Sequence, residues 1–224
     1  MERFPDRDSL ASATAEILAQ ALTTPDPRGL VVTGGGTPGP VYDRLATRDL
    51  DWPNVTLTLT DERWVDTTSP LSNEKLVRDR LLTGRATGAR LIRLKDDGGS
   101  PGADARTAEA TLRLLPPWSA VLIGMGEDGH VASLFPGDPD LAANLDPEGE
   151  RLCVGVARAG LEPLVPRISL TARALLSTRL VVLLITGEAK RALVERIAAD
   201  PNFAPPAATL LRQDRAPVRV LWAA

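Results

Sequence analysis

Apolar residues follow two different spacings along this chain. Short runs rich in Val, Leu, Ile and Thr occupy 29–33, 55–60 and 180–185, whereas 9–22 and 188–199 carry apolar residues at every third or fourth position. Continuous runs of this length are typical of strands buried on both faces, and the second spacing is typical of amphipathic helices. The pattern therefore predicts strands and helices in alternation.

The alternation extends over the whole chain. The expected strands cover 29–33, 55–60, 90–94, 120–123, 151–157, 168–170, 180–185 and 218–222, and the expected helices cover 9–22, a segment through Tyr42 and Leu45, 72–82, 103–115 and 188–199. The Pro-rich turn 25–27 ends the first helix, and 96–102 and 201–206 are expected surface loops. This order predicts an α/β fold with a mostly parallel, Rossmann-like sheet and helices on both faces. We expect one domain over 1–224.

Composition narrows the possible partners. Apolar residues make up 43% and charged residues 25% of the chain, as in ordinary globular proteins. The formal charge is −3 and no basic cluster is present, so neither a nucleic acid nor an anionic membrane is an expected partner. No run approaches the ~20 apolar residues of a membrane span, and the charged N-terminal segment leads us to expect a cytoplasmic location. The single cysteine, Cys153, lies in an apolar run and is expected in the core.

Chemically rich segments follow three of the expected strands. They are 33–38, 61–64 and 124–136. In open α/β sheets, ligands bind beyond the carboxyl ends of the strands. We therefore expect three loops to converge on one rim of the sheet.

The first segment is suited to a phosphate. Gly34, Gly35, Gly36 and Thr37 stand between a strand and a helix, where backbone N–H groups can approach an anion without an intervening Cβ. The lysine of a Walker A loop is missing, and the segment does not match G-x-G-x-x-G, so nucleotide binding is disfavoured. A plain tight turn would also explain these glycines.

Four further segments carry candidate ligands for an anion. Asp61 and Arg63 end a strand, where Arg63 could bind a phosphate or a carboxylate, although a solvated turn with an internal ion pair fits as well. Ser72 and Asn73 begin a helix, and capping alone would explain Ser72. Arg167 and Lys190 could both bind phosphate, and ordinary surface positions would also explain each of them.

His130, the only histidine, lies in the Gly-rich segment 124–136. Its imidazole has an unperturbed pKa of about 6.5 and can act as a free base at neutral pH. A lone histidine is often structural, but a position after a strand in a Gly-rich loop favours catalysis. Asp128, two residues earlier, could orient the ring. One histidine cannot build a His-based zinc site, and we expect no metal.

Taken in order, Gly35 to Pro38, Asp61 to Arg63, Ser72-Asn73, Gly124 to Pro136, Arg167 and Thr186 to Lys190 resemble the 6-phosphogluconolactonase family, of the glucosamine/galactosamine-6-phosphate isomerase-like superfamily, across nearly the whole chain. The sequence departs from the family at Gly36, commonly serine, and at Val131, commonly threonine. The resemblance implies a NagB/RpiA-type sugar-phosphate fold and hydrolysis of 6-phospho-D-glucono-1,5-lactone in the oxidative pentose phosphate pathway. It implies no cofactor, and a monomer or small homo-oligomer is expected.

The resemblance also implies roles for the candidate residues. His130 takes a proton from water and later returns it to the leaving oxygen, while Asp128 orients the ring. The phosphate is expected on Arg63, Arg167, Lys190 and the loop 34–37. The expected substrate site also includes Asp61, Ser72, Asn73 and Gly126.

Three alternatives compete with this interpretation. The same loop resembles that of glucosamine-6-phosphate deaminases, but these carry a catalytic glutamate where this chain has Phe135, which can neither accept nor relay a proton. A sugar-phosphate-binding regulator would not need both His130 and Asp128. A serine hydrolase using Ser133 would require a G-x-S-x-G turn, and the sequence around Ser133 does not match it.

Overall fold

A parallel sheet forms the centre of the protein, as seen in a computed structural model that describes residues 1–23, 28–96, 99–157, 160 and 162–224. Within these residues the sheet has the order β1-β10-β9-β6-β2-β3-β5, and every neighbouring pair is parallel. The strands are β1 (Glu2–Arg3), β2 (Gly29–Val32), β3 (Thr56–Leu59), β5 (Arg90–Leu91), β6 (Ala120–Ile123), β9 (Val181–Thr186) and β10 (Val218–Ala223). Every residue of β2 and β6 is buried, which explains their uninterrupted apolar sequences.

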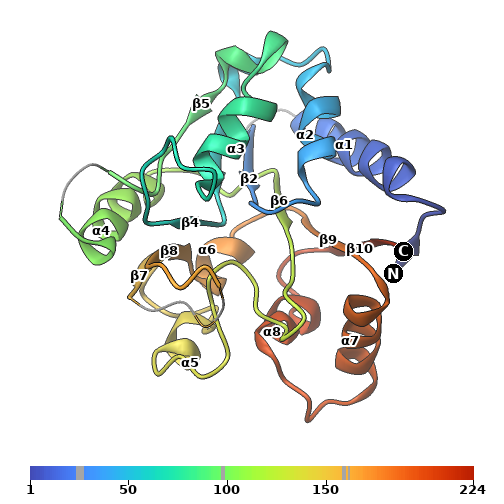
Figure 1. Cartoon of the computed structure of the whole chain (residues 1–224), viewed down its shortest axis with the longest axis vertical. Coiled ribbons are helices and arrows are strands. Elements are labelled where there is room, and N and C mark those ends of the chain that lie inside the picture. The colour runs from blue at the N-terminus through green and yellow to red at the C-terminus, as the bar shows by residue number, and fades with distance from the viewer. Residues whose placement is uncertain (24–27, 97–98, 158–159, 161) are drawn as a thin grey trace.

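Helices cover both faces of this sheet, as expected. Figure 1 shows α1 (Arg7–Thr23) and α2 (Gly39–Ala46) on one side and α7 (Glu188–Ala199) and α8 (Pro206–Arg212) on the other. Helix α1 buries Leu10, Ile17 and Leu18 in the core. The predicted fold class, a mostly parallel α/β sheet between two layers of helices, is confirmed.

A second, antiparallel sheet was not predicted. It has the order β4-β8-β7 and consists of β4 (Asp61–Arg63), β8 (Arg167–Leu170) and β7 (Cys153–Val156). Periodicity placed β7 and β8 among the strands but could not give their direction. Residues 157–166 separate them, and a parallel crossover needs a dozen or more residues, so the pair forms antiparallel. The expectation that 61–63 is a loop was wrong, because these residues pair with β8.

Thr60 is where the two sheets meet. Its N–H donates to the Val32 carbonyl of the large sheet (2.8 Å), and its own carbonyl accepts from Leu170 N–H of the small sheet (2.9 Å). The chain therefore passes from one sheet to the other within a single residue. This junction places the end of β3 and the whole of β4 beside the rim of the large sheet.

Four further helices and two 3₁₀ turns complete the described part of the fold. Helix α3 (Asn73–Arg80) follows β4, α4 (Pro101–Leu112) packs on β7, and α5 (Leu141–Asn144) and α6 (Ala172–Leu176) flank the small sheet. The 3₁₀ turns η1 (Trp52–Asn54) and η2 (Gly84–Gly88) were not predicted. The expected loop 96–102 ends in the first turn of α4, and the loop 201–206 ends at the start of α8. The expected turn at 25–27 and residues 97–98 lie outside the described residues.

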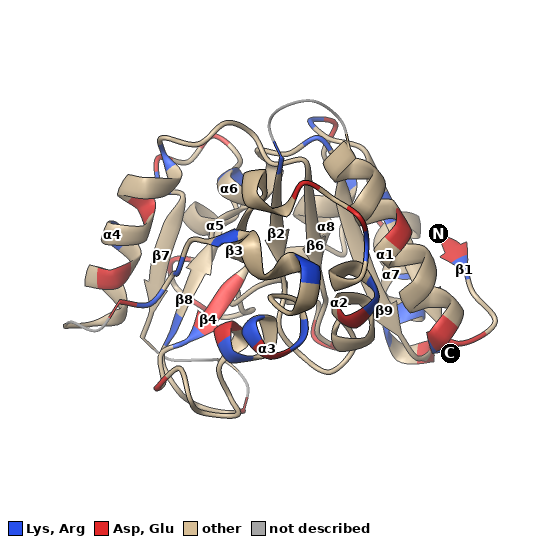
Figure 2. Ribbon diagram, turned by 90° about the horizontal axis from the view of Figure 1, so that it is seen from above, with Lys and Arg blue, Asp and Glu red and all other residues tan. Residues whose placement is uncertain are grey.

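Two predictions from composition have a structural counterpart. Cys153 is fully buried, as expected, and burial raises the pKa of its thiol to about 12. Figure 2 shows basic and acidic residues interspersed over the molecule. Among the described residues, no helix is both long and apolar enough to cross a membrane.

Candidate active site

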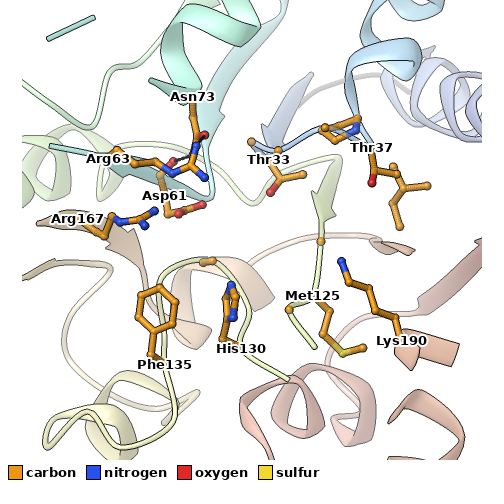
Figure 3. Close-up of a pocket in the computed structure, with 18 of the residues that line it drawn as sticks. Thr33, Thr37, Asp61, Arg63, Asn73, Met125, His130, Phe135, Arg167 and Lys190 are labelled. Carbon is orange, nitrogen blue, oxygen red and sulfur yellow. Dashed lines mark hydrogen bonds between the residues drawn. The ribbon is translucent and has the colours of Figure 1, made fainter. Parts of the chain in front are cut away.

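A cavity of about 280 Å³ lies at the carboxyl ends of β2 and β6, beside β4 (Figure 3). Most of the predicted site residues line it: Gly34, Gly35, Gly36, Thr37, Asp61, Arg63, Asn73, Gly126, His130, Arg167 and Lys190. These residues come from six separate segments of the chain. The predicted convergence on one rim of the sheet is confirmed, with β4 a strand rather than a loop.

The glycine loop is anchored at its start and open along its length. Tyr42 of α2 is fully buried, and its hydroxyl accepts from Thr33 N–H (2.9 Å) and donates to the Thr33 carbonyl. Gly35 has φ +97°, a conformation that side chains rarely adopt. The N–H groups from Gly34 to Thr37 donate to no acceptor in the described chain. The loop thus presents unpaired donors to the cavity, as a phosphate site requires.

The His130 loop follows β6 and fixes the imidazole from several directions. Asp128 Oδ1 lies 2.6 Å from His130 Nδ1 and also accepts from His130 N–H (3.1 Å). Gly126 N–H donates to the His130 carbonyl (2.9 Å), and a Cβ at Gly126 would lie 2.2 Å from His130 Nδ1. Only glycine therefore permits this approach. In the tautomer that donates Nδ1–H to the Asp128 carboxylate, the lone pair of the neutral imidazole is on Nε2.

The wall of the cavity around β4 is built on Asn73, the first residue of α3. Asn73 Nδ2 donates to the Asp61 carbonyl (2.8 Å), and its Oδ1 accepts from Arg63 Nη1 (2.5 Å). The Leu71 carbonyl accepts from the same Nη1 (3.0 Å). Arg63 Nε is buried without a partner, and Nη2 has none among the described residues. Nη1 is fixed and Nε is buried, so Nη2 is the nitrogen left to donate to a ligand oxygen.

The carboxylate of Asp61 is held from both sides. It accepts from Thr60 Oγ1 (2.9 Å) and from Ser133 Oγ (2.6 Å). Ser133 is fully buried, and its hydroxyl points to this carboxylate instead of serving as a nucleophile in the cavity. The arrangement gives no support to the serine hydrolase alternative.

Two predicted residues do not line the cavity. Ser72 is buried at the start of α3, where its Oγ accepts from Lys75 N–H (3.1 Å) and donates to Glu62 (3.0 Å). Capping explains Ser72, and we withdraw it as a ligand. Asp128 lies behind the imidazole and not on the cavity surface, as its expected orienting role requires.

Phe135 connects His130 with Arg167. Its ring centroid is 4.7 Å from that of His130, and Arg167 Cζ lies 6.0 Å from it. The guanidinium of Arg167 donates to the carbonyls of Val165 (3.2 Å) and Pro163 (2.9 Å). Burial and the neighbouring charge of Arg63 lower the pKa of Arg167, because β4–β8 pairing places these two arginines opposite each other.

The cations of the cavity form two groups. Lys190 lies in the first turn of α7 and makes no ion pair with any described residue. Figure 3 shows Lys190 and Thr37 on one side of the cavity and Arg63 and Arg167 on the other, with His130 between them. Within the part of the chain that the structure describes, no group of three or more His, Cys, Asp and Glu side chains could hold a metal ion.

Sequence analysis missed part of the lining: Thr33, Pro38, Gly124, Met125, Ala132, Phe135, Glu162 and Leu184. Thr33 and Gly124 directly follow β2 and β6, so the strand-end rule that found their neighbours would have found them too. Phe135 was considered only for the chemistry it lacks. Glu162 carries no sequence signal, because it reaches the cavity from the connection between β7 and β8.

Comparisons with known proteins agree with this geometry. A family model described as "Glucosamine-6-phosphate isomerases/6-phosphogluconolactonase" matches residues 6–222. A 6-phosphogluconolactonase of Caulobacter vibrioides is 48% identical over the whole chain and 97% of that relative. The crystal structure of a 6-phosphogluconolactonase from Shewanella baltica has a TM-score of 0.92 at 33% identity, covering 100% of this chain and 97% of that one. A monomeric glucosamine-6-phosphate deaminase of the NagB superfamily shares the fold, with a TM-score of 0.78 at 20% identity over 98% and 97% of the two chains.

Proposed function

We propose that this protein hydrolyses 6-phospho-D-glucono-1,5-lactone with His130 as the general base. The chain belongs to the family of glucosamine-6-phosphate isomerases and 6-phosphogluconolactonases, and within it the chain is a 6-phosphogluconolactonase, a carboxylic ester hydrolase. The product is 6-phospho-D-gluconate, formed in the oxidative pentose phosphate pathway. One observation carries the residue assignment. The contact of Asp128 with His130 Nδ1 leaves Nε2 without this partner, in the same cavity as the loop 34–37 with its unpaired N–H groups.

The two groups of cations lead us to revise the expected phosphate site. We expected Arg63, Arg167 and Lys190 to bind the phosphate together, but Lys190 lies on the other side of His130 from the two arginines (Figure 3). The free N–H groups of 34–37 and the unpaired Lys190 suit the phosphate, since both are donors without protein acceptors. The arginines then face the lactone end of the substrate, because Arg167 and His130 both contact Phe135.

In this pose the reaction needs one proton carrier. Water attacks C1 of the lactone while His130 Nε2 takes its proton, and the carbonyl oxygen becomes an oxyanion facing the arginines. The C1–O5 bond then breaks, and the imidazolium returns the proton to O5. Asp128 stabilises the imidazolium through Nδ1–H. The carboxylic acid formed at C1 ionises, which accounts for the acid that the reaction releases.

Freshly prepared lactone tests the proposal. Acid release is followed with wild-type protein and with His130→Asn, and spontaneous hydrolysis is subtracted. We expect the variant to lose a factor of roughly 10²–10⁴ in kcat, the usual contribution of a positioned base. A wild type no faster than the background would reject the lactonase, whereas a fully active variant would reject only the role of His130.

Ammonia release from glucosamine 6-phosphate is the parallel measurement for a deaminase. We expect none, because the cavity offers the phenyl ring of Phe135 at the position where the deaminase relay needs a carboxylate. Ammonia release by the wild type would restore the deaminase alternative.

A further inference from the structure

Glu62 is a buried carboxylate just outside the cavity. Its side chain is 1% exposed and is absent from the cavity lining. Oε1 accepts from the N–H groups of Arg63 and Asn73, both at 2.7 Å. Oε2 accepts from Ser72 Oγ (3.0 Å) and Glu74 N–H (2.6 Å). A carboxylate taken out of water needs such donors, and here four of them surround it.

These four donors connect Glu62 to both elements that hold Arg63. Arg63 N–H belongs to β4, and the other three donors form the first turn of α3. The helix start is therefore fixed against the strand by one side chain. Since Asn73 is the first residue of this helix, its side chain is positioned by the same contact.

Asn73 in turn orients the guanidinium of Arg63. Its Oδ1 and the Leu71 carbonyl both accept from Nη1, and Nε is buried, so Nη2 is the nitrogen that stays available. Arg167 lies opposite Arg63 in the β4–β8 pairing, and the two cations repel each other. This repulsion opposes the position in which Asn73 holds the Arg63 guanidinium. The negative charge of Glu62 offsets part of this repulsion.

We propose that Glu62 is a positioning residue that acts through Asn73 and holds Nη2 of Arg63 toward the oxygens at C1 of the substrate. The assignment of those oxygens rests on the proposed function. The orientation of Arg63 itself does not, and it is measured separately below.

A double-mutant cycle tests the coupling. Glu62→Gln keeps the size of the side chain but places an NH₂ group against N–H donors, so the contact with α3 breaks. We expect kcat for the lactone to fall roughly 10- to 100-fold in the wild-type background, with a smaller change in KM. In an Arg63→Met background the same substitution should cost less than twofold. Equal losses in both backgrounds would overturn the proposal.

Glu109→Gln is the matched control. Glu109 is 6% exposed, accepts from Leu152 N–H and Arg151, and joins α4 to the segment before β7, away from the cavity. This variant should lower the melting temperature and leave kcat and KM unchanged. If Glu62→Gln does not fold, Ser72→Ala removes one of the four donors and should show the same dependence on Arg63 with a smaller effect.

An NMR measurement separates this proposal from the proposed function. The Nε–H resonance of Arg63, identified by its loss in Arg63→Met, should be sharp and slowly exchanging in the wild type. In Glu62→Gln we expect it to shift and to exchange at least tenfold faster. An unchanged resonance would overturn the positioning role whether or not the wild type hydrolyses the lactone.

Discussion

Asp128 fixes the orientation of the His130 ring. Its carboxylate lies 2.6 Å from Nδ1, so in the proposed mechanism Nε2 is the nitrogen that accepts the proton. Gly126 makes the approach possible, because any Cβ at that position would collide with the imidazole. Gly126 therefore has a steric function in placing the imidazole.

Lys190 provides a test of the phosphate assignment at the residue scale. Lys190→Met should raise KM for the phosphorylated lactone roughly 10- to 100-fold with little change in kcat, because a charge-assisted contact to a non-reacting group contributes uniform binding. Steady-state rates with glucono-1,5-lactone, which has no phosphate, should not change. Lys75→Met is the control, since Lys75 pairs with Asp79 on the surface of α3. Equal effects on both lactones would contradict the assignment.

At the scale of elements, the cavity depends on how closely the glycine loop approaches α3. A Cβ at Gly34 would lie 1.8 Å from Asn73 Oδ1, the atom that holds Arg63. Glycine is required here by the close approach, in contrast to Gly35, where the positive φ requires it. The glycine loop 34–37 is thus packed directly against Asn73, the residue that holds Arg63.

Gly34→Ala is therefore expected to impair both stability and catalysis. Displacing Asn73 should cost about 1–3 kcal/mol, lower the melting temperature by roughly 2–10 °C and lower kcat more than tenfold. Thermal unfolding and lactone hydrolysis measure the two effects. Gly102→Ala in α4 is the control and should keep full activity, since its Cβ would meet only Arg106 at 3.8 Å. A Gly34→Ala variant with wild-type kcat would show that Asn73 can move without consequence.

At the scale of the whole molecule, buried and paired carboxylates make stability depend on pH. Burial by itself would raise the pKa of Glu109, but hydrogen bonds from Leu152 N–H and Arg151 and the nearby arginine charges outweigh it, and the pKa is lowered from 4.5. Such a group stabilises the fold above its unfolded pKa, and the contribution is lost as the pH falls through the lowered value. The pKa of Glu62 shifts in the opposite direction, because burial raises it despite four hydrogen bonds.

The lowered pKa of Glu109 predicts how stability depends on pH. The difference in unfolding free energy between the wild type and Glu109→Gln should be largest above pH 5 and should shrink below pH 4.5, where the wild-type carboxyl protonates and resembles the amide. Urea unfolding at a series of pH values between 3 and 6 measures this difference. A difference that stays constant over the series would show that the charge of Glu109 contributes nothing.

Several features follow from the sequence alone, because their causes are local. Apolar spacing identifies the buried strands and amphipathic helices, and the rule for strand ends brings the glycine loop and His130 together before any coordinates are known. Asp128 lies only two residues from His130, so their contact is also a local property. These features account for the predicted fold class and for the pairing of Asp128 with His130 beside the glycine loop.

The rest depends on contacts between distant segments. The antiparallel sheet and the contact of Phe135 with Arg167 depend on pairing between β4 and β8, which lie about a hundred residues apart. Which nitrogen of Arg63 stays available depends on Asn73 and Glu62, and the spacing of apolar residues does not report such contacts. The sequence determines which groups are present at the strand ends, and the tertiary structure decides the direction in which each of them points.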